Sequence, residues 1–597
     1  MDKFSLFEIL FKKDEQSEID DRVRGKRFFS RQFSGSVTKQ LKRMLSTRPF
    51  KMARAVSHLL SHVSTRVYGA AMLTFGLLGV MMYFLGLSAD MRALTPVIGI
   101  AFALLSIPFL LADKTLPVFL SDFSPTDFIF YELFCMKRHT GETIAPFPIL
   151  VSVFVGFGLA VFSVFMPLWQ IALIIGVLVC ISVGMESPEF VFLASLFALP
   201  YVRFIPYGEV WLIAVTVFAL ISFLVKVFYG KRVIYVEAYD IFLGVMLLFI
   251  LISGIFLKGT ESFSGSLGMI ALSVGYILAG NIITNRRLAE RSVNAVVISV
   301  VISSLISLTQ LIVTALTAGP DINGEAFNFI LARQDGMAVF FIAGALLAVG
   351  MIKQSAGPAR GAYICSVALI AISLILSGEV FAIFAVLIGI LAYFVLKNNS
   401  HPGIVLPLML LLPMLSLLLP NAILNYIFAY SPSILSAEGL FDLWNNSLGV
   451  FANNLFVGIG IGAESFAEEM AALGLFGYPD SSNLFIELGL EAGIFALLSF
   501  FCILITRMKH RSIQYLYLRN SQIEHLSCIS GACVVSLLAF GMVNYIWSEP
   551  SAYYFFWYLF GIGSATLRVA KKDYDDKMVY YEESSAFDSS VIDIEIG

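Results

Sequence analysis

The most constraining feature of the chain is a long interval, residues 402–506, without a single basic side chain. It contains no lysine, arginine or histidine, whereas it carries eight carboxylates. Membrane proteins retain lysine and arginine on the cytoplasmic side, so a large loop that lacks them points outward. The longest polar stretch between hydrophobic segments falls inside this interval. The sequence therefore predicts one large extracytoplasmic loop, which we place at residues 420–483.

The composition indicates a membrane protein. Hydrophobic residues make up 58% of the 597 positions, and charged residues make up 14%. Apolar runs recur along most of the chain, with lengths close to the roughly 20 residues that a helix needs to cross a bilayer. In lipid only helices and closed barrels satisfy the backbone, and runs of this length are helical. We predict an all-α polytopic fold with about sixteen transmembrane helices, in a range of about 12–16.

The basic residues also predict the orientation. In this topology only four of the 39 lysines and arginines lie outside, namely Arg92, Arg203, Lys258 and Arg333. The other 35, and all six histidines, lie at or near the cytoplasmic ends of the predicted helices. A shift by one span would mix the two populations in every later loop. We therefore expect both termini to be cytoplasmic and the chain to cross the membrane many times.

Four regions follow from charge and hydropathy. Residues 1–66 carry 15 basic and seven acidic side chains, and the part from 36 to 66 suits a segment that rests on anionic membrane lipid. An ordinary positive flank that orients the first span is the alternative. Residues 67–292 form a first set of transmembrane helices, and residues 293–569 form a second set that includes the large loop. Residues 570–597 are an acidic tail that we predict to be cytoplasmic and disordered.

The second set of helices contains an ordered series of residues in and after the large loop. The glycines allow positive φ and a close approach of the backbone to a partner or another helix. The tryptophan can anchor a segment at the headgroup level or stack on a sugar. The series consists of Gly439, Trp444, Asn454, Gly458, Gly460, Gly462, Ser482, Asn483, Glu491 and Gly493.

This series resembles the conserved block of the bacterial O-antigen ligase and O-antigen polymerase family. In that family the block has a tryptophan, an Asn-Pro pair, a Gly-x-Gly element, a His-Asn pair, and then Glu and Gly. Here Asn454 and the Gly458-Ile-Gly460 element stand at the matching positions. Glu491 and Gly493 follow Ser482 by nine and eleven residues, as Glu and Gly follow the family's histidine. The resemblance covers roughly residues 293–569.

The resemblance implies a GT-C-like architecture in a bacterial inner (plasma) membrane. It implies cell-surface polysaccharide assembly, with transfer of a glycan from a polyprenyl-diphosphate carrier by an inverting glycosyltransferase of the ligase or polymerase type. It identifies the lipid-linked glycan as the partner, and no nucleic acid is expected. The substrate-binding residues that we expect are Trp444, Asn454, Gly458, Gly460, Asn483 and Arg333.

The chain departs from the family where catalytic charge is expected. Leu440 and the Gly378-Glu379 pair stand where the family has arginines, and Ser482 stands where it has histidine. Transfer needs a base for the attacking hydroxyl and stabilisation of the departing diphosphate. We therefore take Asp480, Ser482 and Glu438 as the catalytic candidates. No resident metal or other cofactor is predicted, although the carboxylates would suit Mg²⁺ or Ca²⁺.

Three alternatives stay open at this point. The chain could be a non-catalytic relative that only binds lipid-linked glycan. It could instead be a transporter or flippase, because Glu487 and Glu491 lie within a predicted span and intramembrane carboxylates often mark ion paths. A scaffold that recruits partners through its basic N-terminal region is the third alternative.

Overall fold

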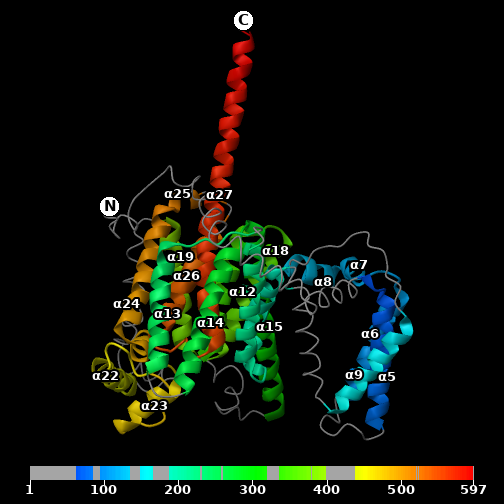
Figure 1. Ribbon diagram of the computed structural model, residues 1–597, viewed down its shortest axis with the longest axis horizontal. Coiled ribbons are helices and arrows are strands. Elements are labelled where there is room, and N and C mark those ends of the chain that lie inside the picture. Colours follow the sequence, from blue (N-terminus) through cyan, green and yellow to red (C-terminus); the bar gives the residue numbers. More distant parts are fainter. Residues whose placement is uncertain are drawn as a thin grey trace. The chain divides into compact units, whose positions relative to one another are not determined.

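Figure 1 shows the computed structural model of the chain. The described residues are 62–84, 95–134, 148–165, 184, 187–228, 232–256, 260–318, 335–377, 379–398, 437–519, 521 and 523–595. Nearly all of them are helical, and their one extended pairing is an isolated bridge between Ser64 and Thr115. The predicted all-α fold is therefore confirmed for this part of the chain.

The chain forms two compact units. The smaller unit consists of Asp21–Leu193 and Ile221–Arg232, and the larger unit includes Ala194–Leu220 and Val233–Gly597. In the smaller unit α5 packs against α6 and α9. The helices described there are α5 (Thr65–Phe84), α6 (Thr95–Leu111), α7 (Leu116–Asp122), α8 (Ser124–Thr126), the π-helix η1 (Asp127–Leu133), α9 (Ile149–Phe165) and the start of α11 (Pro188–Ala198).

The larger unit is a helix bundle. Its closely packed pairs include α13 with α24, α14 with α27, and α19 with α26. Its helices are the 3₁₀-helix η2 (Leu199–Phe204), the part of α12 (Gly208–Phe228) up to Leu220, α13 (Ala238–Phe256), α14 (Thr260–Ile282), α15 (Arg286–Ala318), α17 (Asp335–Gln354), α18 (Pro358–Leu376), α19 (Val380–Asn398), α22 (Ala437–Asn453), α23 (Ala463–Ala472), α24 (Leu484–Ile513), α25 (Tyr515–Leu518), α26 (Glu524–Phe540) and α27 (Pro550–Glu595).

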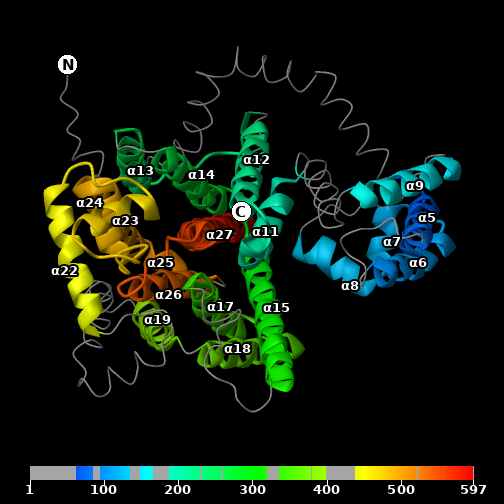
Figure 2. The same cartoon turned by 90° about the horizontal axis from the view of Figure 1, so that it is seen from below.

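Helix α27 lies at the centre of this bundle (Figure 2). Every residue from 551 to 567 is buried, and most of them are aromatic or small. A helix that is apolar on all sides belongs in an interior, because no face of it favours water. Gly561 lets α14 come close, since an added β-carbon would lie 2.7 Å from the β-carbon of Ala279. The helix continues to Glu595, and the disorder predicted for residues 570–597 stays a prediction.

The length and composition of the helices agree with a membrane protein. Within the described residues, nine helices are long and apolar enough to cross a membrane, and three more apolar helices are shorter. A helix of 20 residues is about 30 Å long, which matches the hydrocarbon core of a bilayer. This class, an all-α membrane protein, is the one that the sequence predicts.

Part of the predicted extracytoplasmic loop has a structure of its own. Residues 437–483 fold into α22, α23 and the segments that connect them to α24. Figures 1 and 2 show α22 lying across one end of the bundle rather than along its axis. The described part of the large loop, residues 437–483, is therefore a small helical layer that covers one end of α24.

Candidate functional site

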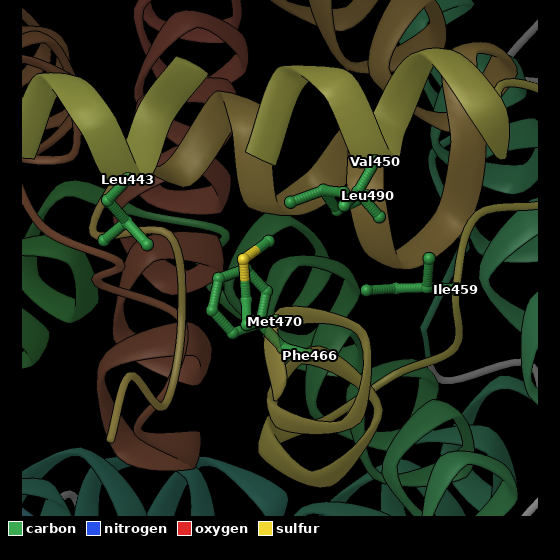
Figure 3. Close-up of a cluster of buried hydrophobic side chains, with 6 residues drawn as sticks. All are labelled: Leu443, Val450, Ile459, Phe466, Met470 and Leu490. Carbon is green, nitrogen blue, oxygen red and sulfur yellow. The ribbon is translucent and has the colours of Figure 1, made fainter. Parts of the chain in front are cut away.

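An apolar cluster holds this helical layer on α24. Leu443 and Val450 project from α22 and meet Phe466 and Met470 of α23 (Figure 3). Ile459 and Leu490 complete the cluster, so the segment between α22 and α23 is fixed against α24 as well. Burial of such side chains contributes about 1.5–3 kcal/mol each. The position of the loop residues therefore follows from packing and not only from chain connectivity.

Helix α24 is broken near this cluster. Gly493 has φ 79° and ψ 177°, so residues 484–492 and 494–513 form two helical segments with a kink between them. A break frees backbone groups that must find other partners. The amide of Ile494 donates to the carbonyl of Leu455 at 2.8 Å, and the carbonyl of Leu490 accepts from the amide of Ile459 at 2.7 Å. The segment between α22 and α23 thus satisfies both sides of the break.

The glycines of the Gly-Ile-Gly element are required by this contact. Gly458 has φ 83°, and a β-carbon on it would overlap the carbonyl oxygen of Leu490. A β-carbon on Gly493 would overlap the carbonyl oxygen of Phe456 in the same way. Gly460, at φ 107°, lies close to the hydroxyl of Ser262, which accepts a hydrogen bond from the next amide at 2.8 Å. These glycines bring two backbone segments into contact, and their predicted role in substrate binding stays a prediction.

Glu491 connects three segments at the break. One carboxylate oxygen accepts from the amide of Gly462 at 3.1 Å, and the other accepts from the hydroxyl of Tyr545 at 2.6 Å. The backbone carbonyl of Glu491 accepts from the hydroxyl of Ser253 in α13. Hydrogen bonds to a carboxylate are the stronger kind. Glu491 therefore joins α13, the glycine segment and the turn that follows α26.

A second carboxylate lies one turn earlier in α24. Glu487 accepts from the amide of Ser481 at 2.7 Å. The neighbouring amide, that of Ser482, donates to the carboxylate of Asp480 at 2.8 Å. Ser482 has φ 51°, which is unusual for a residue with a side chain. The segment before α24 is thus held by two carboxylates, and both Asp480 and Ser482 are partly exposed.

Asn483 is the N-cap of α24. Its side-chain oxygen accepts from the amides of Phe485 at 2.9 Å and Ile486 at 3.2 Å. These amides lie in the first turn of the helix, where no backbone carbonyl of the helix can accept from them. Its side-chain nitrogen donates to the carbonyl of Met542 at 2.8 Å. Because Asn483 is nearly fully buried and fully used in these bonds, its clearest role is to fix the start of α24 against the turn after α26.

The electrostatics of this end are dominated by carboxylates. The side chains of Glu487 and Glu491 are 1% and 3% exposed, and within the described residues neither forms an ion pair with a basic side chain. Asp480 interacts electrostatically with both. Outside the helices that can cross a membrane, a hydrogen bond with Glu261 raises the pKa of Glu464, and charge repulsion adds to this shift. Groups of this kind accept hydrogen bonds from hydroxyls and bind cations, whereas they repel anions.

The other predicted residues lie at varied places. Trp444 is 6% exposed, so its ring packs into the layer, and its indole nitrogen has no hydrogen-bond partner within the described part of the chain. Asn454 directly follows α22, and its carbonyl accepts from the amide of Gly458 at 2.9 Å. Glu438 lies in the first turn of α22, but its side chain is outside the described residues, as is Arg333. Among the described residues no group of three metal-ligating side chains gathers.

Three residues at the break were not expected from the sequence. Tyr545, Ser253 and Ser262 contact positions that lie 54, 238 and 199 residues away along the chain. Serine and tyrosine are common in apolar helices, so nothing in their local sequence distinguishes them.

The fold and this end of the bundle define an all-α membrane protein with a broken helix beneath a helical layer. No protein-family model matches the chain, and no curated protein sequence matches it.

Proposed function

We propose that this protein takes part in cell-surface polysaccharide assembly and binds a lipid-linked glycan at the end of the bundle covered by α22 and α23. The proposal is carried by one observation: the elements between Asn454 and Gly493 that resemble the ligase family meet at one place. The Gly458 segment contacts the backbone beside Glu491 and Gly493, and Asn483 caps the same helix.

Binding of sugar hydroxyls is the mode that these side chains support best. Asp480 is partly exposed and lies beside two buried carboxylates, so this end offers acceptors for hydroxyl groups. Transfer from a diphosphate carrier would also need a cation for the leaving group. Arg333 is the candidate for this cation from the sequence. We therefore propose glycan binding as the function. Glycosyl transfer requires in addition a cation that stabilises the departing diphosphate at this site.

A transporter or flippase is the second candidate. The observation in its favour is that α24 is discontinuous and carries two buried carboxylates next to its break. Broken helices and intramembrane carboxylates are features of transporter sites. In such a protein the carboxylates would bind a proton or another cation, and the break would be the point where the two segments of α24 move.

The orientation in the membrane belongs to the same proposal. We propose that the layer of α22 and α23 is extracytoplasmic and that both termini are cytoplasmic, because residues 402–506 have no basic side chain. A cysteine at the exposed position Glu468 should react with an impermeant thiol reagent in whole cells, and one at the exposed position Lys572 should not. Wild-type protein gives the background from its own cysteines. The reverse labelling would place the layer in the cytoplasm.

One comparison tests the function. The lengths of lipid-linked oligosaccharides should differ between cells with and without this gene, and purified protein in nanodiscs should bind the lipid-linked oligosaccharides of those cells. Movement of the same lipid between leaflets of proteoliposomes, without a change in glycan length, would favour the flippase. Equal oligosaccharide profiles together with no binding would contradict the proposal.

A further inference from the structure

A strained turn lies at the start of α12. The amide of Gly208 donates to the carbonyl of Ile205 at 2.8 Å, which closes a four-residue turn with Pro206 as its second residue. Tyr207 is the third residue and has φ 56°. Turns with proline second and a positive φ third normally have glycine or asparagine at the third position. Gly208 must itself be glycine, because a β-carbon on it would overlap the carbonyl oxygen of Val202.

The strain at Tyr207 is not offset by packing of its ring. The residue is 82% exposed, and its side chain has no hydrogen bond, ion pair or ring contact within the part of the chain that the structure describes. Among the described residues, Tyr207 and Ser482 are the non-glycine residues with positive φ. Ser482 lies at the candidate site, where Asp480 holds its amide. Strained residues that persist are concentrated at functional sites, so the strain at Tyr207 directs attention to this turn.

The surroundings of Tyr207 suit a sugar. Phe204, the last residue of η2, directly precedes the turn, is 53% exposed and offers a second aromatic face. Arg203 and Glu549 form an ion pair of 3.0 Å, with side chains that are 39% and 27% exposed. Exposed ion pairs contribute little to folding, so these planar groups can hydrogen-bond a ligand at low cost. Aromatic faces beside a guanidinium and a carboxylate match the apolar faces and the hydroxyls of a pyranose.

The turn after α26 links this patch to the candidate site. Glu549 follows Tyr545 by four residues, so one short segment contacts both Arg203 and Glu491. Both places therefore lie at the same end of the larger unit. Arg203 is also the one basic residue predicted on the extracytoplasmic side that falls within the described residues.

We propose that Arg203, Phe204, Tyr207 and Glu549 form a subsite for an oligosaccharide, which receives sugars beyond those held at the break in α24. This inference rests on the proposed function. The faces of one or two sugar rings stack on Tyr207 and Phe204, and their hydroxyls bond to Arg203 and Glu549. A glycan that occupies both places is bound with higher affinity than one that reaches only the carboxylates.

Replacement of Tyr207 by glycine separates this role from a structural one. Glycine adopts positive φ without strain, so Tyr207→Gly should melt at the same temperature as wild type or higher. Its affinity for oligosaccharides released by mild acid from the lipid-linked pool should fall about tenfold, which corresponds to the loss of one stacking contact. Tyr207→Phe keeps the ring and should stay within about threefold of wild type. Phe84→Ala removes an equally exposed aromatic side chain of the smaller unit and should change nothing.

The outcomes separate the subsite from the proposed function. If wild type binds the oligosaccharides, Asp480→Asn weakens binding and Tyr207→Gly does not, the subsite is wrong while the function stands. If wild type binds none of them, both are wrong. If Tyr207→Gly binds normally but loses stability in nanodiscs and not in detergent, the ring is an anchor in the membrane interface, and the sugar subsite is rejected.

Discussion

Tyr545 donates its hydroxyl hydrogen to the carboxylate of Glu491 over 2.6 Å, and both residues are buried. This bond joins the turn between α26 and α27 to the break in α24. The second oxygen of the same carboxylate holds the amide of Gly462 at the end of the glycine segment. One carboxylate thus connects the central helix α27, through its preceding turn, with the layer formed by α22 and α23.

Removal of this hydroxyl should therefore loosen the layer. In Tyr545→Phe the buried carboxylate loses a donor, and an unsatisfied buried acceptor costs about 1–3 kcal/mol. Tyr553→Phe is the matched control, because Tyr553 is also buried but bonds to the neutral hydroxyl of Ser273 at 2.7 Å. Thermal unfolding in detergent should show the larger loss for Tyr545→Phe. Equal losses would mean that Glu491 has no special part in holding the turn.

The contact between Gly458 and the break predicts a strong effect of a single methyl group. Gly458→Ala combines positive φ with overlap at the Leu490 carbonyl. Overpacking of this kind costs about 1–3 kcal/mol, and backbone strain adds to it.

A glycine in a helix provides the control for this substitution. Gly449 lies in α22 with no atom within 4 Å of an added β-carbon, so Gly449→Ala should be neutral or stabilise by up to about 1 kcal/mol. Unfolding temperatures of the two variants test this. A Gly458→Ala protein as stable as wild type would mean that close contact between the Gly458 segment and the backbone of α24 does not contribute to stability.

The sequence predicted the class of fold because hydropathy acts along the chain. Runs of about 20 apolar residues specify helices in lipid whatever their neighbours are, and the described helices agree with this. The central place of α27 could be anticipated less well. Its aromatic residues read equally well as a lipid-facing surface or as a buried core, and only packing against α14, α26 and other helices distinguishes them.

The candidate site was only partly predictable. The spacing of Gly458, Gly460, Glu491 and Gly493 was visible, but its meaning, a segment seated in a broken helix, depends on contacts across the chain. Trp444 was expected to anchor a segment at the headgroup level or to stack on a sugar; its side chain is 6% exposed, and its role in substrate binding stays a prediction.

Stability should depend on pH through Glu464. Its raised pKa, caused by the hydrogen bond with Glu261 and by charge repulsion, means that the folded state holds a proton more tightly than the unfolded state. As pH falls from neutral towards the ordinary value of 4.5, the folded state therefore gains stability from this group. Glu464→Gln should raise the unfolding temperature at pH 7 and reduce the gain on acidification. Glu468→Gln, on the exposed side of α23, is the control. If the unfolding temperatures of wild type and Glu464→Gln depend on pH in the same way, Glu464 does not contribute to the pH dependence of stability.

The last prediction concerns catalysis, if the protein transfers glycans. Asp480 is the partly exposed carboxylate beside Ser482, where the ligase family has its histidine, and two buried carboxylates lie close to it. A positioned base contributes about 10²–10⁴-fold to a proton transfer. Asp480→Asn should therefore reduce glycan transfer by about this factor while it keeps the size and one hydrogen-bond acceptor of the side chain.

Two further variants decide whether Asp480 acts in this way. Glu438→Gln tests the other candidate base in the first turn of α22, and Glu468→Gln tests a carboxylate that faces away on α23. Transfer rates should be lost in Asp480→Asn and retained in Glu468→Gln, with equal unfolding temperatures in both. If transfer persists in Asp480→Asn and in Glu438→Gln alike, no substitute base acts here. If purified wild-type protein transfers nothing from the carrier lipids that it binds, glycan binding alone is the function of this end of the bundle.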